Sequence, residues 1–236
     1  MVLTRAKQVN IKLAHNVMKM TFLIVHGLVT FLLLIGACSS RTENGQVTEN
    51  VTVDPSNGLP SNAVPGKVLI VYLSRTNNTK AVADMIHKRV GGTLVPLELV
   101  TPYPENYRAT VEQVVKENET GFLPPLKTKI DNIQQYDVVF VGFPTWGMQL
   151  PPPMKSFLRQ YGLRGKTVVP FNTNGGYGIG STFQTVKELC PNSSVLEGFT
   201  VRGGSERDGQ LLVIQGSKAN EVETDVLNWL KKIKVI

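Results

Sequence analysis

The sequence is poor in the residues that build metal centres and disulfides. Its 236 residues include two cysteines and three histidines. His15, His26 and His87 are not grouped with cysteine or acidic residues, so no metal site is indicated. Because Cys38 ends a leader segment, Cys190 is left without a partner, and no intrachain disulfide is expected. We interpret Cys190, in VKELCP, as a buried apolar residue rather than a reactive thiol.

Motifs of two common enzyme classes are also missing. No G-x-G-x-x-G follows the first predicted strand, which excludes the usual signature of a dinucleotide site. No G-x-S-x-G occurs, so the nucleophile elbow of serine hydrolases is absent. No acid/base pair with a clear substrate role is visible. The sequence therefore predicts no catalytic side chain, and whether the protein is an enzyme stays open.

The positive charge is not arranged as in a nucleic-acid-binding protein. The formal net charge is +7, and charged residues make up 18% of the chain. Four of the basic residues, with no acid among them, precede Cys38: Arg5, Lys7, Lys12 and Lys19. The remainder of the chain has only a modest excess of positive charge and no basic stripe with interleaved aromatics. A nucleic-acid partner is therefore not predicted.

The longest apolar run is too short for an ordinary membrane-spanning helix. Residues 21–35 give about fifteen mainly apolar residues after Lys19, against the roughly 20 that a span requires. The run ends in Gly36-Ala37-Cys38, which resembles a bacterial lipobox. We therefore expect a lipoprotein signal peptide at 1–37 and lipidation of Cys38. An uncleaved N-terminal anchor with an incidental cysteine is the alternative.

A segment of low hydrophobicity follows the predicted lipid site. Residues 38–65, above all 41–65, are rich in Ser, Thr, Asn, Gly and Pro, without a sustained apolar period. Such a composition predicts a flexible tether with a reach of roughly 25–30 Å. The domain at 66–236 would then be exported and held near a bacterial membrane, on its periplasmic side or at the cell surface.

From residue 67 onward, apolar runs alternate with amphipathic segments. The predicted strands are residues 67–73, 93–99, 137–143, 166–172 and 194–201, with a small added strand at 211–215. The predicted helices are residues 78–90, 106–118, 152–161, 181–189 and 218–233. Alternating strands and helices predict an α/β fold with a doubly wound, five-stranded parallel sheet. Five such units are too few for an eight-unit barrel.

The first strand is followed by a loop rich in hydroxyl and amide side chains, Ser74-Arg75-Thr76-Asn77-Asn78-Thr79. In an open parallel sheet, ligands bind at the carboxyl ends of the strands. Hydroxyl donors, free N–H groups and the positive end of the helix dipole together favour a phosphate. An ordinary N-cap is the alternative, although one such residue suffices for a cap.

The stretch YLSRTNNTKAVA resembles the signature of flavodoxins, and the resemblance extends over residues 67–233. It implies the strand order 2-1-3-4-5 and flavin mononucleotide (FMN) as cofactor. It also implies that the FMN phosphate is bound by side chains of Ser74, Thr76, Asn78 and Thr79, and by backbone N–H groups of Arg75 and Asn77.

The loop after the third strand resembles the Pro-x-Trp-x-x-x-x-Pro stretch that lines the flavin ring in this family. It contains Pro144, Thr145, Trp146 and Gly147. The resemblance implies that Trp146 stacks on the ring, and that the peptide of Gly147 flips so that its carbonyl accepts a hydrogen bond from N5–H of reduced flavin. Some relatives carry two adjacent tryptophans here, so the stacking geometry stays open.

The loop after the fourth strand resembles the Thr-x-Gly-Gly-x-Gly segment of the same family. Its residues are Thr173, Asn174, Gly175, Gly176, Tyr177 and Gly178. The resemblance implies that their N–H groups meet the pyrimidine edge of the flavin, and that Tyr177 covers the outer face of the ring.

Together the three loops predict an FMN-dependent redox protein in which the flavin supplies the chemistry. Two options remain within this class: an electron carrier with an unknown redox partner, and a reductase of quinones or other small electrophiles. A non-catalytic, lipid-anchored binding module that has lost flavin is the alternative from another class.

Overall fold

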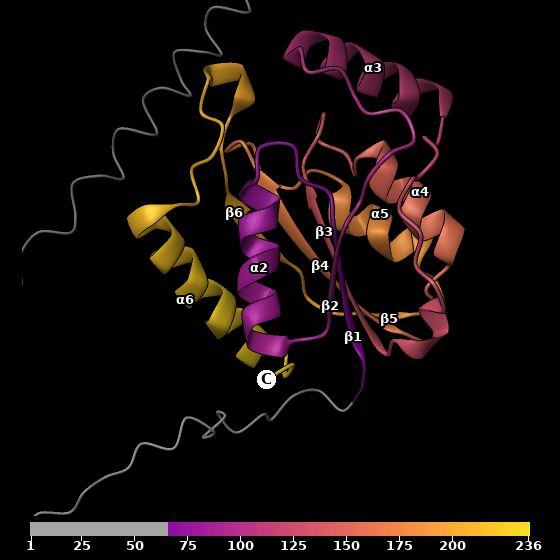
Figure 1. The fold of residues 1–236 in the computed structure, drawn as a ribbon, viewed down its shortest axis with the longest axis vertical. Coiled ribbons are helices and arrows are strands. Elements are labelled where there is room, and N and C mark those ends of the chain that lie inside the picture. The colour runs from indigo at the N-terminus through magenta and orange to yellow at the C-terminus, as the bar shows by residue number, and fades with distance from the viewer. Residues whose placement is uncertain (1–65) are drawn as a thin grey trace, which may run out of the picture. The chain divides into compact units, whose positions relative to one another are not determined.

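The computed structural model describes residues 66–236, and within them strands and helices alternate from β1 to α6 (Figure 1). The predicted signal peptide, the lipid site at Cys38 and the tether lie outside the described residues. Among the helices of residues 66–236, none is both long and apolar enough to cross a membrane.

A parallel sheet forms the centre of the domain. Its strands are β1 (Val68–Tyr72), β2 (Thr93–Pro96), β3 (Val138–Pro144), β4 (Thr167–Asn174), β5 (Ser194–Val195) and β6 (Phe199–Arg202). The order β2-β1-β3-β4-β5 is the predicted one, and every pairing is parallel. The register places Ile70 beside Phe140, and Phe140 beside Val169. The predicted α/β fold and strand order are thus confirmed.

The fifth position of the sheet differs from the prediction of one strand over 194–201. Two short strands, β5 and β6, pair in turn with β4. Between them, Gly198 packs so tightly that a Cβ atom there would lie 2.6 Å from the ring of Phe183. The ring occupies the space that a side chain at this position would need, so glycine is required there, and a glycine inside a strand weakens it.

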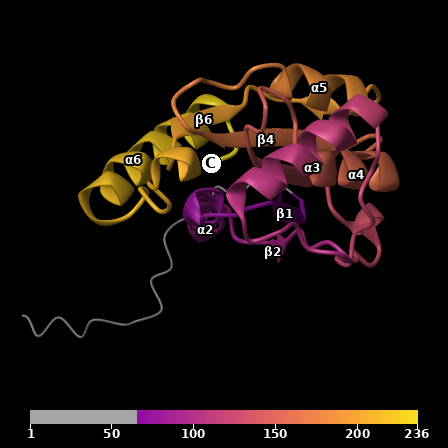
Figure 2. The ribbon, with the colours of Figure 1, turned by 90° about the horizontal axis from the view of Figure 1, so that it is seen from above.

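Helices cover both faces of the sheet (Figure 2). The helices are α2 (Asn78–Val90), α3 (Tyr107–Thr120), α4 (Pro152–Tyr161), α5 (Thr182–Leu189) and α6 (Gly216–Lys232), with short 3-10 turns η1 (Ile133–Gln135) and η2 (Glu206–Asp208). Successive residues of a strand point to opposite faces. Ile70 packs in the core under α2 and α6, whereas Leu69 packs in the core under α4 and α5.

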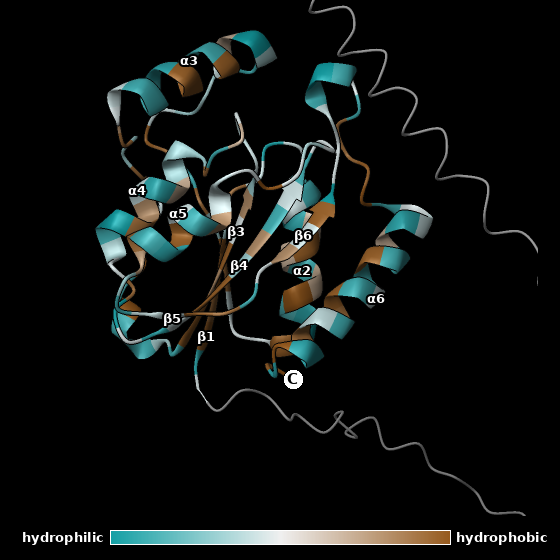
Figure 3. Cartoon of the chain, turned by 180° about the vertical axis from the view of Figure 1, so that it is seen from behind, coloured by the Kyte–Doolittle hydropathy of each residue, from teal (hydrophilic) through white to brown (hydrophobic). Residues whose placement is uncertain are grey.

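The colouring by hydropathy shows apolar strands inside and polar helix surfaces outside, as this layering requires (Figure 3). A strand that is buried on both faces has a continuous run of apolar residues. Both β1 and β3 are buried in this way, so their positions can be predicted from the sequence.

Helix α3 is placed differently from the other helices. It lies beyond the carboxyl ends of the strands, where its contacts are with α4 (Figure 1). Only Thr110, Val114 and Glu117 are buried along its length. The helix therefore covers the edge of the sheet at which the three predicted loops emerge.

The predicted strand at 211–215 is wrong. This segment runs without a sheet partner, and its backbone is held by a side chain instead. Asn78 Oδ1 accepts hydrogen bonds from the N–H groups of Val213 and Ile214, at 3.0 and 3.1 Å. The apolar residues were read as a strand, but a side chain from α2 satisfies the backbone that a strand would have paired.

Candidate functional site

The three predicted loops meet at one cavity at the carboxyl edge of the sheet. Its volume is about 380 Å³, within the range of small-molecule sites. The predicted residues that line it are Arg75, Thr76, Asn78, Thr79, Pro144, Thr145, Trp146, Gly147, Thr173, Asn174, Gly175, Tyr177 and Gly178. Ser74, Asn77 and Gly176 are in the same loops but do not line this cavity.

The loop before α2 offers hydrogen-bond donors without acceptors. The backbone N–H groups of residues 75–79 donate to no backbone carbonyl in the described part of the chain. Asn77 takes a left-handed conformation, with φ of 63°, and its side chain does not cap the helix. Free N–H groups at the positive end of a 13-residue helix form a site for an anion.

The hydroxyl oxygens of Ser74 and Thr76, next to this helix start, each accept a hydrogen bond from within the protein. Ser74 Oγ accepts from the N–H of Lys80 at 3.2 Å, and Thr76 Oγ1 accepts from Asn78 Nδ2 at 2.9 Å. Each of these hydroxyls therefore keeps its proton for another acceptor. An ordinary N-cap accounts for Ser74 alone, whereas the remaining donors are suited to a phosphate.

Asn78 is buried, and its side chain is used within the protein. Besides accepting from residues 213 and 214, its Nδ2 donates to the carbonyl of Leu211 at 2.5 Å. The amide group joins the start of α2 to the segment 211–214. Its backbone N–H is the group of Asn78 that remains for an anion.

A second hydroxyl contact joins the first loop to the third. Thr79 Oγ1 and Thr173 Oγ1 are 2.8 Å apart in a buried position. Next to them, fully buried Asn172 donates to the carbonyl of Phe143 at 3.1 Å and to Thr145 Oγ1 at 2.9 Å. Asn172 fixes the loop after β3 against β4. Its role is not predicted from the sequence, because Asn172 lies at the end of the strand predicted at 166–172.

Trp146 begins a tight hairpin turn. Trp146 and Gln149 exchange backbone hydrogen bonds of 3.3 and 3.0 Å. Gly147 and Met148 between them have φ values of 55° and 60°, as in type I′ turns. The carbonyl of Met148 accepts from the N–H of Ser181 at 2.9 Å, which holds this turn beside the third loop. A glycine at position 147 is favoured by this backbone conformation.

The indole of Trp146 is supported from the side of α3. The ring of Tyr103 meets it edge-on, with centroids 5.3 Å apart and an angle of 86°. The hydroxyl of Tyr103 donates to buried Glu117 of α3. Burial, then the hydrogen bond to this carboxylate, raises the pKa of Tyr103. The tyrosine therefore stays neutral and fixes the indole against α3.

The third loop is shaped by its own asparagine. Asn174 Oδ1 accepts from the N–H groups of Gly176 and Gly178, at 2.9 and 3.3 Å. This arrangement turns Tyr177 outward, with 75% of the side chain exposed at the mouth of the cavity. An aromatic ring so exposed is available to cover a ligand.

Residues 204–207, which lie outside the three predicted loops, form one further wall of the cavity. Arg75 ties this wall to the phosphate loop, because its Nε lies 2.9 and 2.8 Å from the two carboxylate oxygens of Glu206. The same guanidinium donates to the carbonyls of Pro104 and Glu105 before α3. All three nitrogens are occupied, so the charge of Arg75 serves the loops rather than the cavity. No motif in residues 204–207 marks this role.

The site has the two features that a nucleotide-like ligand with a flat ring requires. One is the anion-binding start of α2, and the other is the pair of aromatic residues, Trp146 and Tyr177, in the lining of the same cavity. A phosphate fits the free N–H and hydroxyl donors of the first loop. Trp146 and Tyr177 both line the cavity and offer aromatic surface to a flat ring, beside residues of the third loop.

The comparisons identify the class to which this fold and site belong. The flavodoxin family model matches residues 67–213. A provisionally assigned flavoprotein from Bacteroides eggerthii is 31% identical, with a TM-score of 0.58, over 72% of this chain and 99% of that chain. Comparison with curated proteins gives no match. The chain belongs to the flavodoxin family.

Two further structures share the fold at lower identity. One, also a provisionally assigned flavoprotein, is from Bacteroides uniformis: 24% identity and a TM-score of 0.57 over 70% of this chain and 98% of that one. The other is a flavoprotein from Lactobacillus acidophilus solved in complex with FMN: 21% identity and a TM-score of 0.52 over 61% of this chain and 98% of that one.

Proposed function

We propose that residues 66–236 bind FMN and act as a flavin-dependent redox protein. The observation that carries the proposal is the helix start of α2, where free N–H groups and the proton-bearing hydroxyl of Thr76 converge with Trp146 and Tyr177 on one cavity. Membership of the flavodoxin family and the FMN complex of the Lactobacillus flavoprotein support it.

In this proposal the first loop holds the phosphate through its N–H groups and the hydroxyls of Thr76 and Thr79, which line the cavity. The ring lies between Trp146 and Tyr177. The flavin supplies the redox chemistry when it is bound. The residues of the chain bind and orient the flavin. Trp146, which Tyr103 holds in place by an edge-on contact, covers one face of the flavin ring and excludes water from it.

Titration of the purified protein with FMN and with riboflavin tests the proposal. We expect quenching of flavin fluorescence on binding, and at least tenfold weaker binding of riboflavin, because riboflavin lacks the phosphate that the charge-assisted hydrogen bonds hold. Thr76→Val is expected to weaken FMN several-fold and riboflavin little. Protein that is colourless and fails to bind added FMN would favour the binding module that has lost flavin.

We further propose that the protein is exported and that Cys38 carries a lipid which anchors it to a bacterial membrane. The apolar run 21–35 and the lipobox-like Gly36-Ala37-Cys38 support this part of the proposal. Cys38→Ser is expected to move the protein from the membrane to the soluble fraction. Unchanged membrane fractionation would instead favour an uncleaved N-terminal anchor.

A further inference from the structure

A second cavity adjoins the flavin site under α3. Its volume is about 390 Å³, and it shares Thr145, Trp146 and Gly147 with the first cavity. The opposite wall consists of α3 residues, and the ion pair of Arg75 and Glu206 lies at one end. A molecule bound here would lie beside the ring of a bound flavin.

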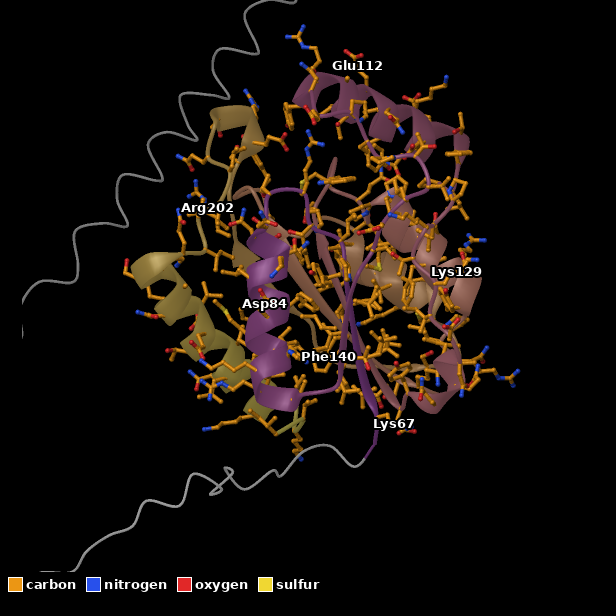
Figure 4. All side chains as sticks on the ribbon, viewed as in Figure 1. Lys67, Asp84, Glu112, Lys129, Phe140 and Arg202 are labelled. Atoms are coloured by element: carbon orange, nitrogen blue, oxygen red, sulfur yellow. The ribbon has the colours of Figure 1, made fainter. Side chains whose placement is uncertain are left out.

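The wall supplied by α3 contains three valines beside the polar residues Thr110, Asn118 and Glu119. Val111, Val114 and Val115 line the cavity, and Val111 and Val115 are 40% and 48% exposed. By contrast, Glu112 lies on the outer side of the same helix (Figure 4). Apolar side chains that line an open cavity expose area which a bound apolar ligand would remove from water.

At the end of the cavity away from Arg75, two amide groups are oriented by one lysine. Lys155 Nζ lies 2.8 Å from Asn118 Oδ1 and 3.4 Å from Gln149 Oε1. An ammonium group has only donors, so each amide must turn its oxygen to Lys155. Each NH₂ group is then directed elsewhere, and neither donates a hydrogen bond among residues 66–236.

The charges in the lining disfavour an anionic ligand. Arg75 is paired with Glu206, and Glu119 adds a second carboxylate, so an anion finds no free cation in the lining. At the amide end, a ligand meets the NH₂ donors of Asn118 and Gln149. The valines and these donors therefore suit an apolar molecule with an oxygen acceptor at one end.

We propose that this cavity binds a flat, apolar carbonyl compound of the quinone class, with its ring system against Val111, Val115 and Trp146 and a carbonyl oxygen at the amides of Asn118 and Gln149. The inference rests on the proposed FMN function only in placing this ligand beside the flavin. Of the two options for the redox protein, a reductase of small electrophiles and an electron carrier with a protein partner, this ligand favours the reductase.

Binding of 2,3-dimethyl-1,4-naphthoquinone to the full chain, measured by calorimetry with and without saturating FMN, tests the proposal. This quinone carries methyl groups at the positions where thiols would add. The matched ligand is 2,3-dimethylnaphthalene, which lacks only the carbonyl oxygens. We expect the quinone to bind at least tenfold more tightly than the hydrocarbon, and FMN to leave quinone binding in place.

Two variants separate the amide end from the apolar wall. Asn118→Asp keeps the shape and the contact with Lys155 but replaces a donor by an acceptor, so quinone affinity should fall at least tenfold and hydrocarbon affinity little. Val111→Thr with Val115→Thr should weaken both ligands several-fold. FMN affinity should be unchanged in each. Asn220→Asp, an exposed site on α6, is the matched charge control and should change nothing.

Equal affinity for quinone and hydrocarbon, or for quinone in wild type and Asn118→Asp, would overturn the inference. Displacement of the quinone by FMN, or a parallel loss of FMN affinity in Asn118→Asp, would also overturn it, because the second cavity would then belong to the flavin ring. A chain that binds quinone through Asn118 but binds no FMN would refute the proposed function and leave the quinone site standing.

Discussion

At the scale of single residues, the site depends on side chains that hold the loops rather than on groups that react. The guanidinium of Arg75 donates hydrogen bonds to Glu206 and to two backbone carbonyls. Asn172 joins the loops after β3 and β4. Such contacts fix the position of Trp146 and of the free N–H groups before any ligand arrives. A preorganised site loses less conformational entropy when its ligand binds.

Gly147 gives the first prediction at this scale. Its φ is 55°, and a Cβ atom there would have no neighbour within 4 Å, so Gly147→Ala is opposed by backbone conformation alone, at about 1–2 kcal/mol. If this peptide flips to accept from N5–H, the substitution should lower the yield of one-electron-reduced flavin in a reductive titration. An unchanged yield would refute the flip; FMN affinity within about threefold of wild type would show that the site is intact.

Cys190 gives a prediction about pH. Burial raises the pKa of its thiol from 9.0 to about 11, so the folded protein keeps the proton more tightly than the unfolded chain does. The resulting stability is complete below pH 9 and is lost as the pH rises toward about 11. The difference in unfolding free energy between wild type and Cys190→Ala, measured in urea, should shrink over this interval.

The control for Cys190 is Cys38→Ser, which should leave the pH dependence of unfolding unchanged. A difference between wild type and Cys190→Ala that stays constant through pH 11 would contradict the prediction. Cys190 is free and buried in the structure, so the interpretation of it as a buried apolar residue is confirmed.

At the scale of elements, the first turn of α2 has two roles, and Asn78 takes part in both. This turn presents donors to an anion, while the side chain of Asn78 holds residues 211–214. At the other end of the helix, Glu223 of α6 pairs with Lys88 and Arg89 of α2. Exposed pairs of this kind contribute little, so the buried side of α2, not its surface charge, keeps it against α6.

Asn78→Ala tests the link between α2 and the segment before α6. The substitution leaves the N–H groups of Val213 and Ile214 without an acceptor, which should cost about 2–3 kcal/mol in the free energy of unfolding. Urea denaturation measures the loss, and hydrogen exchange should show faster exchange at residues 213 and 214. Asn220→Ala, on the exposed side of α6, is the control and should change stability by less than about 0.5 kcal/mol.

A loss for Asn78→Ala no larger than that of the control would show that water replaces the amide at this position. The same comparison bears on the predicted role of Asn78 toward a phosphate. If the Asn78 side chain serves only the fold, FMN affinity of folded Asn78→Ala should stay within about threefold of wild type.

At the scale of the whole molecule, residues 66–236 contain two cores, one on each face of the sheet. Each core is closed by helices of the same segment, and every hydrogen bond described above joins residues within it.

Residues 66–236 expressed alone should therefore fold and bind FMN as the full chain does. Calorimetry should give one cooperative unfolding transition, because a domain of this size with a shared sheet unfolds as a unit. Its midpoint should match that of the Cys38→Ser full chain within about 2–4 °C, which corresponds to roughly 1 kcal/mol for such a domain. A broad transition, or a much lower midpoint, would assign the leader or tether a part in stability.

Local patterns in the amino-acid sequence predict the alternation of strands and helices, the parallel sheet and the three loops of the site. Buried strands such as β1 and β3 require continuous apolar runs, and the loop after β1 carries more hydroxyl and amide groups than a cap uses. These features depend on local composition and on the topology of a parallel sheet, and both are visible in a linear chain.

The way in which the loops are held, and what lies beside them, depends on contacts between residues that are distant in the sequence. The interruption at Gly198, the use of Asn78 by residues 211–214, and the wall at 204–207 each depend on a partner far away in the sequence. The same holds for the cavity under α3, where Lys155 orients amides from two other segments. Contacts of this kind are set by packing in three dimensions, and no local pattern of residues encodes them.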